Sequence, residues 1–255
     1  MKLTEVSAKS GYIWFWNGIL LFRQNSLVFI MLFLMYLLSI MIISIVPVIG
    51  TVLSLFLIPA IRVHFMGACR SVISNKRLIW WTILFNCFRS YSLIFTRRLF
   101  VLSIIYTVLM ELISVLSNLI NNSIVFKMSD AIATKTMLVM MILYTPVSMM
   151  FWFAPILTVW HNLHPVKALF FSIVSCWRNR WAFLIYGLLW LGTIIFSSIG
   201  LIFILEAIVA STAIISIIIV VFIVFVSAML HCSSYATYQG CFQQKEMNIA
   251  DYYQY

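Results

Sequence analysis

The feature that most constrains this chain is an uncharged apolar run from Leu27 to Val46. A helix of about twenty residues, at 1.5 Å per residue, spans the ~30 Å hydrocarbon layer of a bilayer. The whole chain is 64% hydrophobic and 9% charged, whereas about a quarter of the residues in a soluble domain are charged. Because so few polar residues could not cover a water-soluble fold, we predict an all-α integral membrane protein.

Six apolar segments are predicted to cross the membrane within one membrane domain, residues 1–255. They are residues 27–46, 48–66, 99–120, 136–160, 181–204 and 207–230. The first segment is longer than the apolar region of a signal peptide, and Pro47 and Gly50 follow it instead of a cleavage site. We therefore expect it to remain as a membrane anchor.

The basic residues predict the orientation. If the N-terminus is cytoplasmic, only Lys127 and Lys135 among the 16 Lys and Arg residues fall on the outer side. Both termini are then cytoplasmic. The five cysteines fall at or beyond the inner face, so no disulfide is expected. The net charge of +10 lies in short segments between apolar runs, which indicates anionic lipid headgroups as partners and not nucleic acid.

A threefold internal repeat is predicted from three aromatic–arginine pairs, Phe22-Arg23, Phe88-Arg89 and Trp177-Arg178. Each pair ends a short amphipathic stretch and precedes two spans, so each unit is expected to be an interfacial helix followed by a transmembrane hairpin. The units are residues 11–70, 76–164 and 165–240. The residues expected to contact headgroups are Arg23, Arg89, Arg178, Trp14, Trp16, Trp80 and Trp177.

Several motifs carry a family resemblance: residues 14–18 (WFWNG), 21–25 (LFRQN), 150–155 (MFWFAP), 168–172 (ALFFS) and 235–238 (YATY). They resemble an uncharacterised family of six-span Gram-negative inner-membrane proteins. That family is similar in layout to the membrane domain that accompanies some glycerophosphodiester phosphodiesterases. The resemblance implies a bacterial inner-membrane location but no activity, since the catalytic barrel of those phosphodiesterases is absent from this sequence.

Three histidines, His64, His161 and His231, each end the second span of a predicted unit. Around a threefold axis their imidazoles could converge on Zn²⁺, with His164 and Cys232 nearby. The alternative is that each histidine favours the C-terminal end of a helix at the wet interface. Because their spacing matches no ligand motif, no cofactor is expected.

Two charged residues are candidates for an intramembrane role. Glu111 lies deep in the third span, where a carboxylate costs on the order of 3 kcal/mol. It is expected either to relay a proton or cation, or to form a neutral structural hydrogen bond. Arg62, nearer the inner face, is expected to extend its guanidinium to the interface.

The sequence indicates that the protein is not an enzyme, because it has no phosphate-binding loop, no G-x-S-x-G and no paired carboxylates. We expect a polytopic inner-membrane protein that organises lipid or membrane-protein partners, or supports envelope homeostasis. The alternative is a small transporter or channel for a lipid or amphiphile that uses Glu111.

Overall fold

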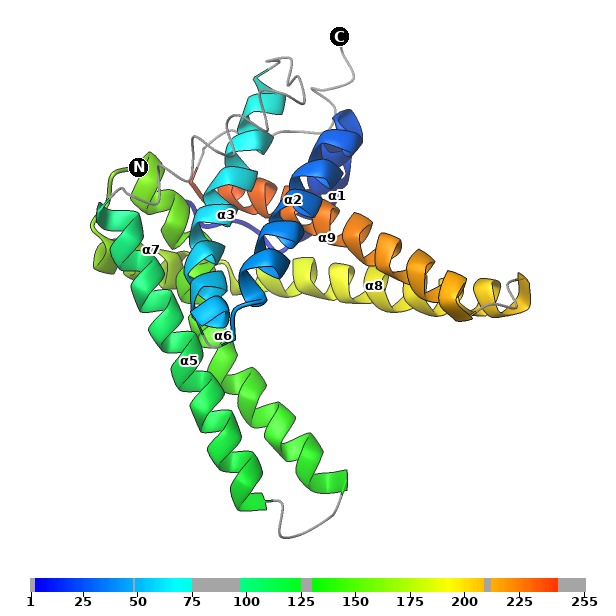
Figure 1. Ribbon diagram of the computed structural model, residues 1–255. Coiled ribbons are helices and arrows are strands. Elements are labelled where there is room, and N and C mark those ends of the chain that lie inside the picture. The colour runs from blue at the N-terminus through cyan, green and yellow to red at the C-terminus, as the bar shows by residue number, and fades with distance from the viewer. Residues whose placement is uncertain (1–2, 48, 75–96, 125–129, 209–211, 243–255) are drawn as a thin grey trace. The chain divides into compact units, whose positions relative to one another are not determined.

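The structure is a computed structural model that describes residues 3–47, 49–74, 97–124, 130–208 and 212–242. Within these residues the chain forms eight helices and no strand (Figure 1). The helices are α1 (Ser10–Gln24), α2 (Ser26–Ser44), α3 (Ile49–Ile73), α5 (Arg97–Ile124), α6 (Asp130–Trp160), α7 (Pro165–Arg178), α8 (Arg180–Ile208) and α9 (Thr212–Phe242). The all-helical prediction is confirmed for this part of the chain.

Six of these helices, α2, α3, α5, α6, α8 and α9, are long and apolar enough to cross a membrane. Their number and order agree with the predicted spans. Four of them continue beyond the predicted ends, α5 and α8 by four residues each, and α3 and α9 by more, to Ile73 and Phe242. The apolar runs alone did not predict the extensions of α3 and α9, in which residues such as Cys69, Tyr238 and Cys241 are buried by packing.

Two shorter helices, α1 and α7, form where amphipathic stretches were predicted. Proline at the first position of α7, Pro165, suits a helix start because its missing N–H would have no partner there. The remaining predicted stretch, which contains Trp80 and ends at Phe88-Arg89, lies outside the described residues. The threefold repeat and its hairpins therefore remain a prediction.

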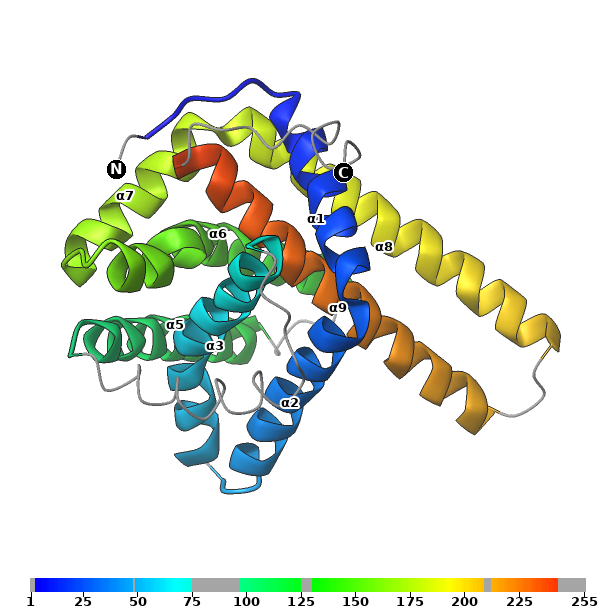
Figure 2. The same ribbon diagram turned by 90° about the horizontal axis from the view of Figure 1, so that it is seen from above.

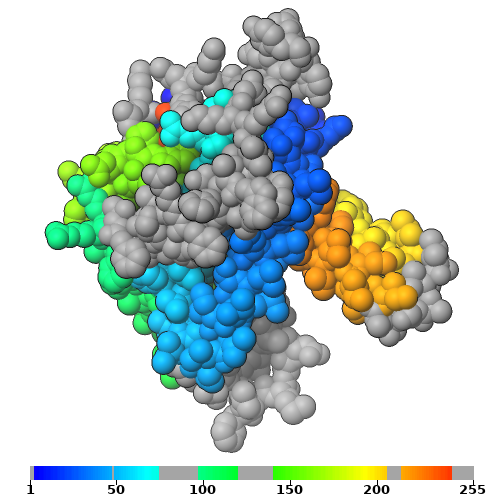
Figure 3. Space-filling model, turned by 45° about the horizontal axis from the view of Figure 1, so that its top comes forward, coloured from blue at the N-terminus to red at the C-terminus, as the bar shows by residue number. Residues whose placement is uncertain are grey.

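The chain divides into two compact units. Unit 1 comprises the described parts of Met1–Ser39, His64–Cys87 and Trp177–Tyr255, and unit 2 comprises those of Ile40–Val63 and Phe88–Cys176. In unit 1, α1 lies across α8 and α9, as Figure 2 shows. Helices α8 and α9 also lie against each other, as their yellow and orange atoms show in Figure 3.

Glycines allow α1 to approach its neighbours in unit 1. A Cβ built on Gly11 would overlap the carbonyl oxygen of Ala182 on α8, and one built on Gly18 would overlap the Cβ of Ser233 on α9. Small residues at such crossings are typical of membrane helices, which gain stability from close backbone contact. The Tyr186 hydroxyl lies 2.5 Å from the Ser233 hydroxyl and joins α8 to α9 in the same region.

In unit 2, α5 and α6 pack side by side (Figure 1), with the rings of Tyr106 and Phe151 4.9 Å apart. Helix α7 docks on α6 through the buried Ser172. Its hydroxyl accepts the N–H of Phe153 at 3.0 Å and donates to the carbonyl of Met149 at 2.7 Å. The Ser172 side chain therefore attaches α7 to the backbone of α6 at these two positions.

Candidate functional site

The residues from Trp177 to Trp181 form the connection between α7 and α8, and we call them the α7–α8 corner. All five belong to unit 1. The two indoles are exposed, Trp177 by 63% and Trp181 by 61%, whereas Asn179 between them is 1% exposed. The corner therefore has a buried anchor and an exposed aromatic and basic surface.

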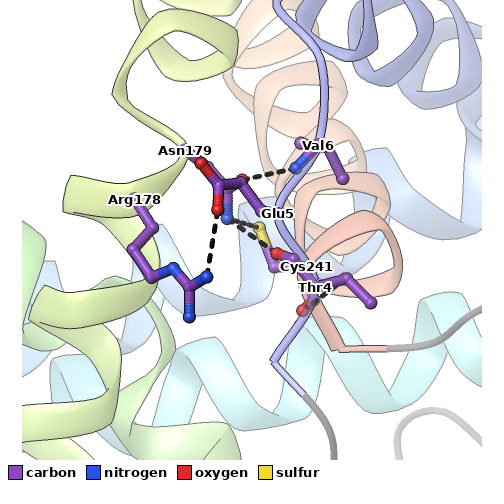
Figure 4. A network of polar contacts seen from close by, with 6 residues as sticks. All are labelled: Thr4, Glu5, Val6, Arg178, Asn179 and Cys241. Carbon is purple, nitrogen blue, oxygen red and sulfur yellow. Dashed lines mark hydrogen bonds and ion pairs between the residues drawn. The ribbon is translucent and has the colours of Figure 1, made fainter.

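Asn179 is the buried anchor (Figure 4). Its Oδ1 accepts the backbone N–H of Val6 at 2.8 Å, and its Nδ2 donates to the carbonyl of Thr4 at 3.2 Å and to the Cys241 sulfur at 3.6 Å. A buried amide is stable only if its donors and acceptor find such partners. Asn179 thus fixes the N-terminal segment, Thr4–Val6, to the corner.

The same segment is bonded to the end of α9. Thr4 donates its backbone N–H to the carbonyl of Cys241 at 3.0 Å, and its hydroxyl lies 2.9 Å from the carbonyls of Gly240 and Cys241. These carbonyls lie in the last described turn of α9, where a side chain or another segment commonly bonds such carbonyls. The N-terminal segment therefore connects the end of α9 to the corner.

Arg180 lies near both exposed indoles. Its guanidinium carbon is 5.9 Å from the ring centroid of Trp177 and 5.7 Å from that of Trp181. Both distances permit cation–π attraction, which uses the face of the guanidinium and leaves the N–H donors in its own plane available. The result is an exposed cation in contact with two aromatic rings.

Arg178, the second cation of the corner, forms an ion pair with Glu5. Its Nη2 lies 3.0 Å from the Oε2 of Glu5 (Figure 4). Both side chains are exposed, so water screens the attraction and the pair contributes little to stability.

Comparison with known proteins places the chain in a family. It is 46% identical over 260 residues to a "probable inner membrane protein" of Burkholderia thailandensis, and the alignment covers 96% of each chain. The chain belongs to this inner membrane protein family. No protein-family model and no solved structure matches it. The resemblance to the membrane domain of glycerophosphodiester phosphodiesterases therefore has no support from these comparisons.

The residues predicted to contact headgroups in this inner membrane protein lie in different surroundings. Trp177 and Arg178 are exposed in the corner, and Trp16 and Arg23 are exposed on α1. Trp14 is 3% exposed, and its ring lies 5.2 Å from that of Phe183 on α8, so its indole contacts protein.

The sequence prediction did not include Glu5, Asn179, Arg180 or Trp181 in the site. The symmetric order Trp-Arg-Asn-Arg-Trp at residues 177–181 was a usable signal for the exposed residues. For Asn179 and Glu5 no local signal existed, because their partners lie 173 or more positions away in the chain.

The three predicted zinc ligands are divided between the units. In unit 1, the ring of His64 stacks on Tyr36 at 6.5 Å, and His231 lies 5.2 Å from Phe65 with its Nδ1 2.8 Å from the carbonyl of Ser227. His161 is exposed at the end of α6 in unit 2. In the described part of the chain no three His, Cys, Asp or Glu residues gather in a group that could hold a metal ion.

Residues 161–164 connect α6 to α7 within unit 2. Asn162 has a left-handed backbone, with φ of 53°, a conformation that asparagine tolerates better than most residues. Its backbone and side-chain oxygens accept hydrogen bonds from Arg98 at the start of α5. This connection is therefore fixed by polar contacts among described residues.

Arg62 and Glu111, the two residues predicted to have an intramembrane role, both belong to unit 2. The guanidinium of Arg62 on α3 lies 4.6 Å above the ring centroid of Trp152 on α6, both in unit 2. Such a contact offsets part of the cost of removing the cation from water. Glu111 is half-buried on α5.

Proposed function

We propose that this inner membrane protein binds anionic phospholipid headgroups at the α7–α8 corner and organises lipid or partner proteins in the membrane without catalysing a reaction. One observation carries the proposal: the Arg180 guanidinium lies within cation–π distance of two exposed indoles, Trp177 and Trp181. Support for envelope homeostasis would be the consequence of such binding.

The chemistry of the corner suits a lipid headgroup. Tryptophan favours the membrane interface because its ring is apolar and its N–H needs a polar partner. A guanidinium binds phosphate oxygens with two parallel hydrogen bonds, and its charge is attracted to anionic lipid. Trp177 and Trp181 would therefore fix the depth of the corner, and Arg180 would bind the phosphate.

The orientation is part of this proposal. The distribution of Lys and Arg supports cytoplasmic termini, which would place the corner and Arg23 at the cytoplasmic leaflet. The inner surface of a bacterial membrane is rich in anionic lipid, so the overall charge of +10 favours the same placement.

The alternative function is transport or conduction of a lipid or amphiphile by way of Glu111. Its support is the half-buried position of Glu111 on α5, a candidate span, because intramembrane carboxylates commonly serve ion or proton movement. Replacing Glu111 by Gln removes the charge at nearly constant size. Unchanged growth of a deletion strain complemented with this variant would argue against transport.

Native mass spectrometry of the full chain in detergent tests headgroup binding. Titration with phosphatidylglycerol and phosphatidylcholine should show tighter binding of the anionic lipid. Arg180→Gln should weaken phosphatidylglycerol binding about fivefold, which corresponds to about 1 kcal/mol for one basic residue near an anionic surface. Replacing Trp177 and Trp181 by Ala should weaken it further.

The matched control is Lys9→Gln, which removes an exposed cation of unit 1 outside the corner. It should reduce binding less than Arg180→Gln does. Equal affinity of the wild-type protein for both lipids would contradict the proposed function. An equal loss of phosphatidylglycerol affinity in Lys9→Gln and Arg180→Gln would contradict the role of the corner.

A further inference from the structure

Glu5 and Arg178 meet at the edge of the α7–α8 corner, 3.0 Å apart. We infer that the Glu5 carboxylate occupies the position on Arg178 that a lipid phosphate takes, so that the N-terminal segment competes internally with anionic headgroups. The inference rests on the proposed headgroup binding and adds to it a built-in inhibitor.

The backbone on both sides of Glu5 is fixed. Thr4 is bonded to Asn179 and to the carbonyl of Cys241, and Val6 donates its N–H to Asn179 (Figure 4). The carboxylate is therefore held near Arg178 before the pair forms. Such preorganisation gives an intramolecular group a high effective concentration, which a competing ligand must exceed.

The side chains themselves are free to exchange partners. Glu5 is 64% exposed and Arg178 is 49% exposed, so breaking their contact costs little. The buried hydrogen bonds of Asn179 hold the N-terminal segment independently of this ion pair. A phosphate can thus displace the carboxylate while the segment stays in place.

The charge balance makes this contact unusual for the chain. It has 6 Asp and Glu against 16 Lys and Arg, and one of these six carboxylates faces a cation beside the exposed indole of Trp177. Neutralising Arg178 reduces the attraction of the corner for anionic lipid, because each basic residue near the surface adds to that attraction. Glu5 therefore lowers the affinity of the corner for anionic lipid.

A double-mutant cycle tests the competition. The full chain in detergent is titrated with phosphatidylglycerol by native mass spectrometry as wild type, Glu5→Gln, Arg178→Gln and the double variant. Glu5→Gln should raise the affinity about fivefold, the effect of one additional basic residue at the surface. In the Arg178→Gln background the same change should have no effect, because the cation that Glu5 masks is gone.

Asp130→Asn is the matched control, since it removes one carboxylate from the first residue of α6 in unit 2. It should leave the affinity unchanged. A gain equal to that of Glu5→Gln, or a gain of Glu5→Gln that persists without Arg178, would show a general charge effect and overturn the inference. No gain from Glu5→Gln in the wild-type background would also overturn it.

Two further results separate this inference from the proposed function. If wild type binds phosphatidylglycerol and phosphatidylcholine equally, headgroup binding itself fails; if it prefers phosphatidylglycerol and the cycle shows no coupling, only the competition fails. Inorganic phosphate added as a competitor should displace little lipid. Complete displacement would assign Arg178 to free phosphate and overturn the lipid assignment.

Discussion

Gly18 of α1 lies directly against Ser233 of α9, and a Cβ on Gly18 would overlap the Cβ of Ser233. The contact is between a short helix and a candidate span of unit 1, and it leaves no space for a side chain on α1. The hydroxyl of Ser233 lies at the same time 2.5 Å from that of Tyr186 on α8. Ser233 on α9 therefore contacts both α1 and α8, and it limits how closely these three helices approach one another.

Gly18→Ala should destabilise the protein for this reason. Inserting a methyl group into a packed contact typically costs about 1–3 kcal/mol, and we expect a lower apparent Tm in detergent by differential scanning fluorimetry. Gly187→Ala on α8 is the matched control, because a Cβ there meets no atom within 4 Å. Equal thermal stability of the two variants would show that α1 is not packed against α9 in this way.

Ser172→Ala tests the attachment of α7 to α6. The change removes the hydroxyl that bridges Phe153 and Met149. We expect the free energy of unfolding to fall by about 1–2 kcal/mol, since each of the two hydrogen bonds contributes about 1 kcal/mol. A lower apparent Tm in detergent would show this loss.

The comparison variant for this prediction is Ser148→Ala on α6, whose hydroxyl donates to the carbonyl of Thr145 at an exposed site within its own helix. It should leave the apparent Tm nearly unchanged. A Ser172→Ala protein as stable as the wild type would mean that apolar contacts alone hold α7.

The sequence predicted the six candidate spans because each is a continuous apolar run, and a bilayer demands such runs. It did not predict that α9 extends to Phe242, because the last turns contain polar and aromatic residues that only tertiary packing buries. Trp14 and Trp16 show a similar limit. Residues two positions apart on a helix face nearly opposite directions, so one indole is buried and the other is exposed, and the apolar pattern could not tell which.

The α7–α8 corner was predictable in part from the sequence. Its exposed tryptophans and arginines are adjacent in the sequence, so their joint location follows from local structure. The role of Asn179 depends on Thr4 and Val6, which reach it only through the folding of unit 1.

Asn179→Ala should release the N-terminal segment. The change leaves the N–H of Val6 and the carbonyl of Thr4 without their side-chain partner, which costs about 1–3 kcal/mol for each group that remains buried. Hydrogen–deuterium exchange should show faster exchange at Thr4–Val6. Arg178→Gln is the contrasting change, because it removes only an exposed ion pair, and exchange in the segment should stay as in the wild type. Unchanged protection in Asn179→Ala would show that other contacts hold the segment.

The cytoplasmic placement of the corner is testable by cysteine labelling in spheroplasts. The native Cys69, Cys176, Cys232 and Cys241 are buried, so replacing Cys87 by Ser should give a background with little reactivity. Into this background, Trp177→Cys places a thiol at an exposed position of the corner, and Lys127→Cys places one in the predicted outer loop.

Because the positive-inside distribution puts these positions on opposite sides, a membrane-impermeant maleimide should label Lys127→Cys in intact spheroplasts. It should label Trp177→Cys only after permeabilisation. Labelling of Trp177→Cys in intact spheroplasts would place the corner in the periplasm, and the cations of the corner would then face the opposite leaflet.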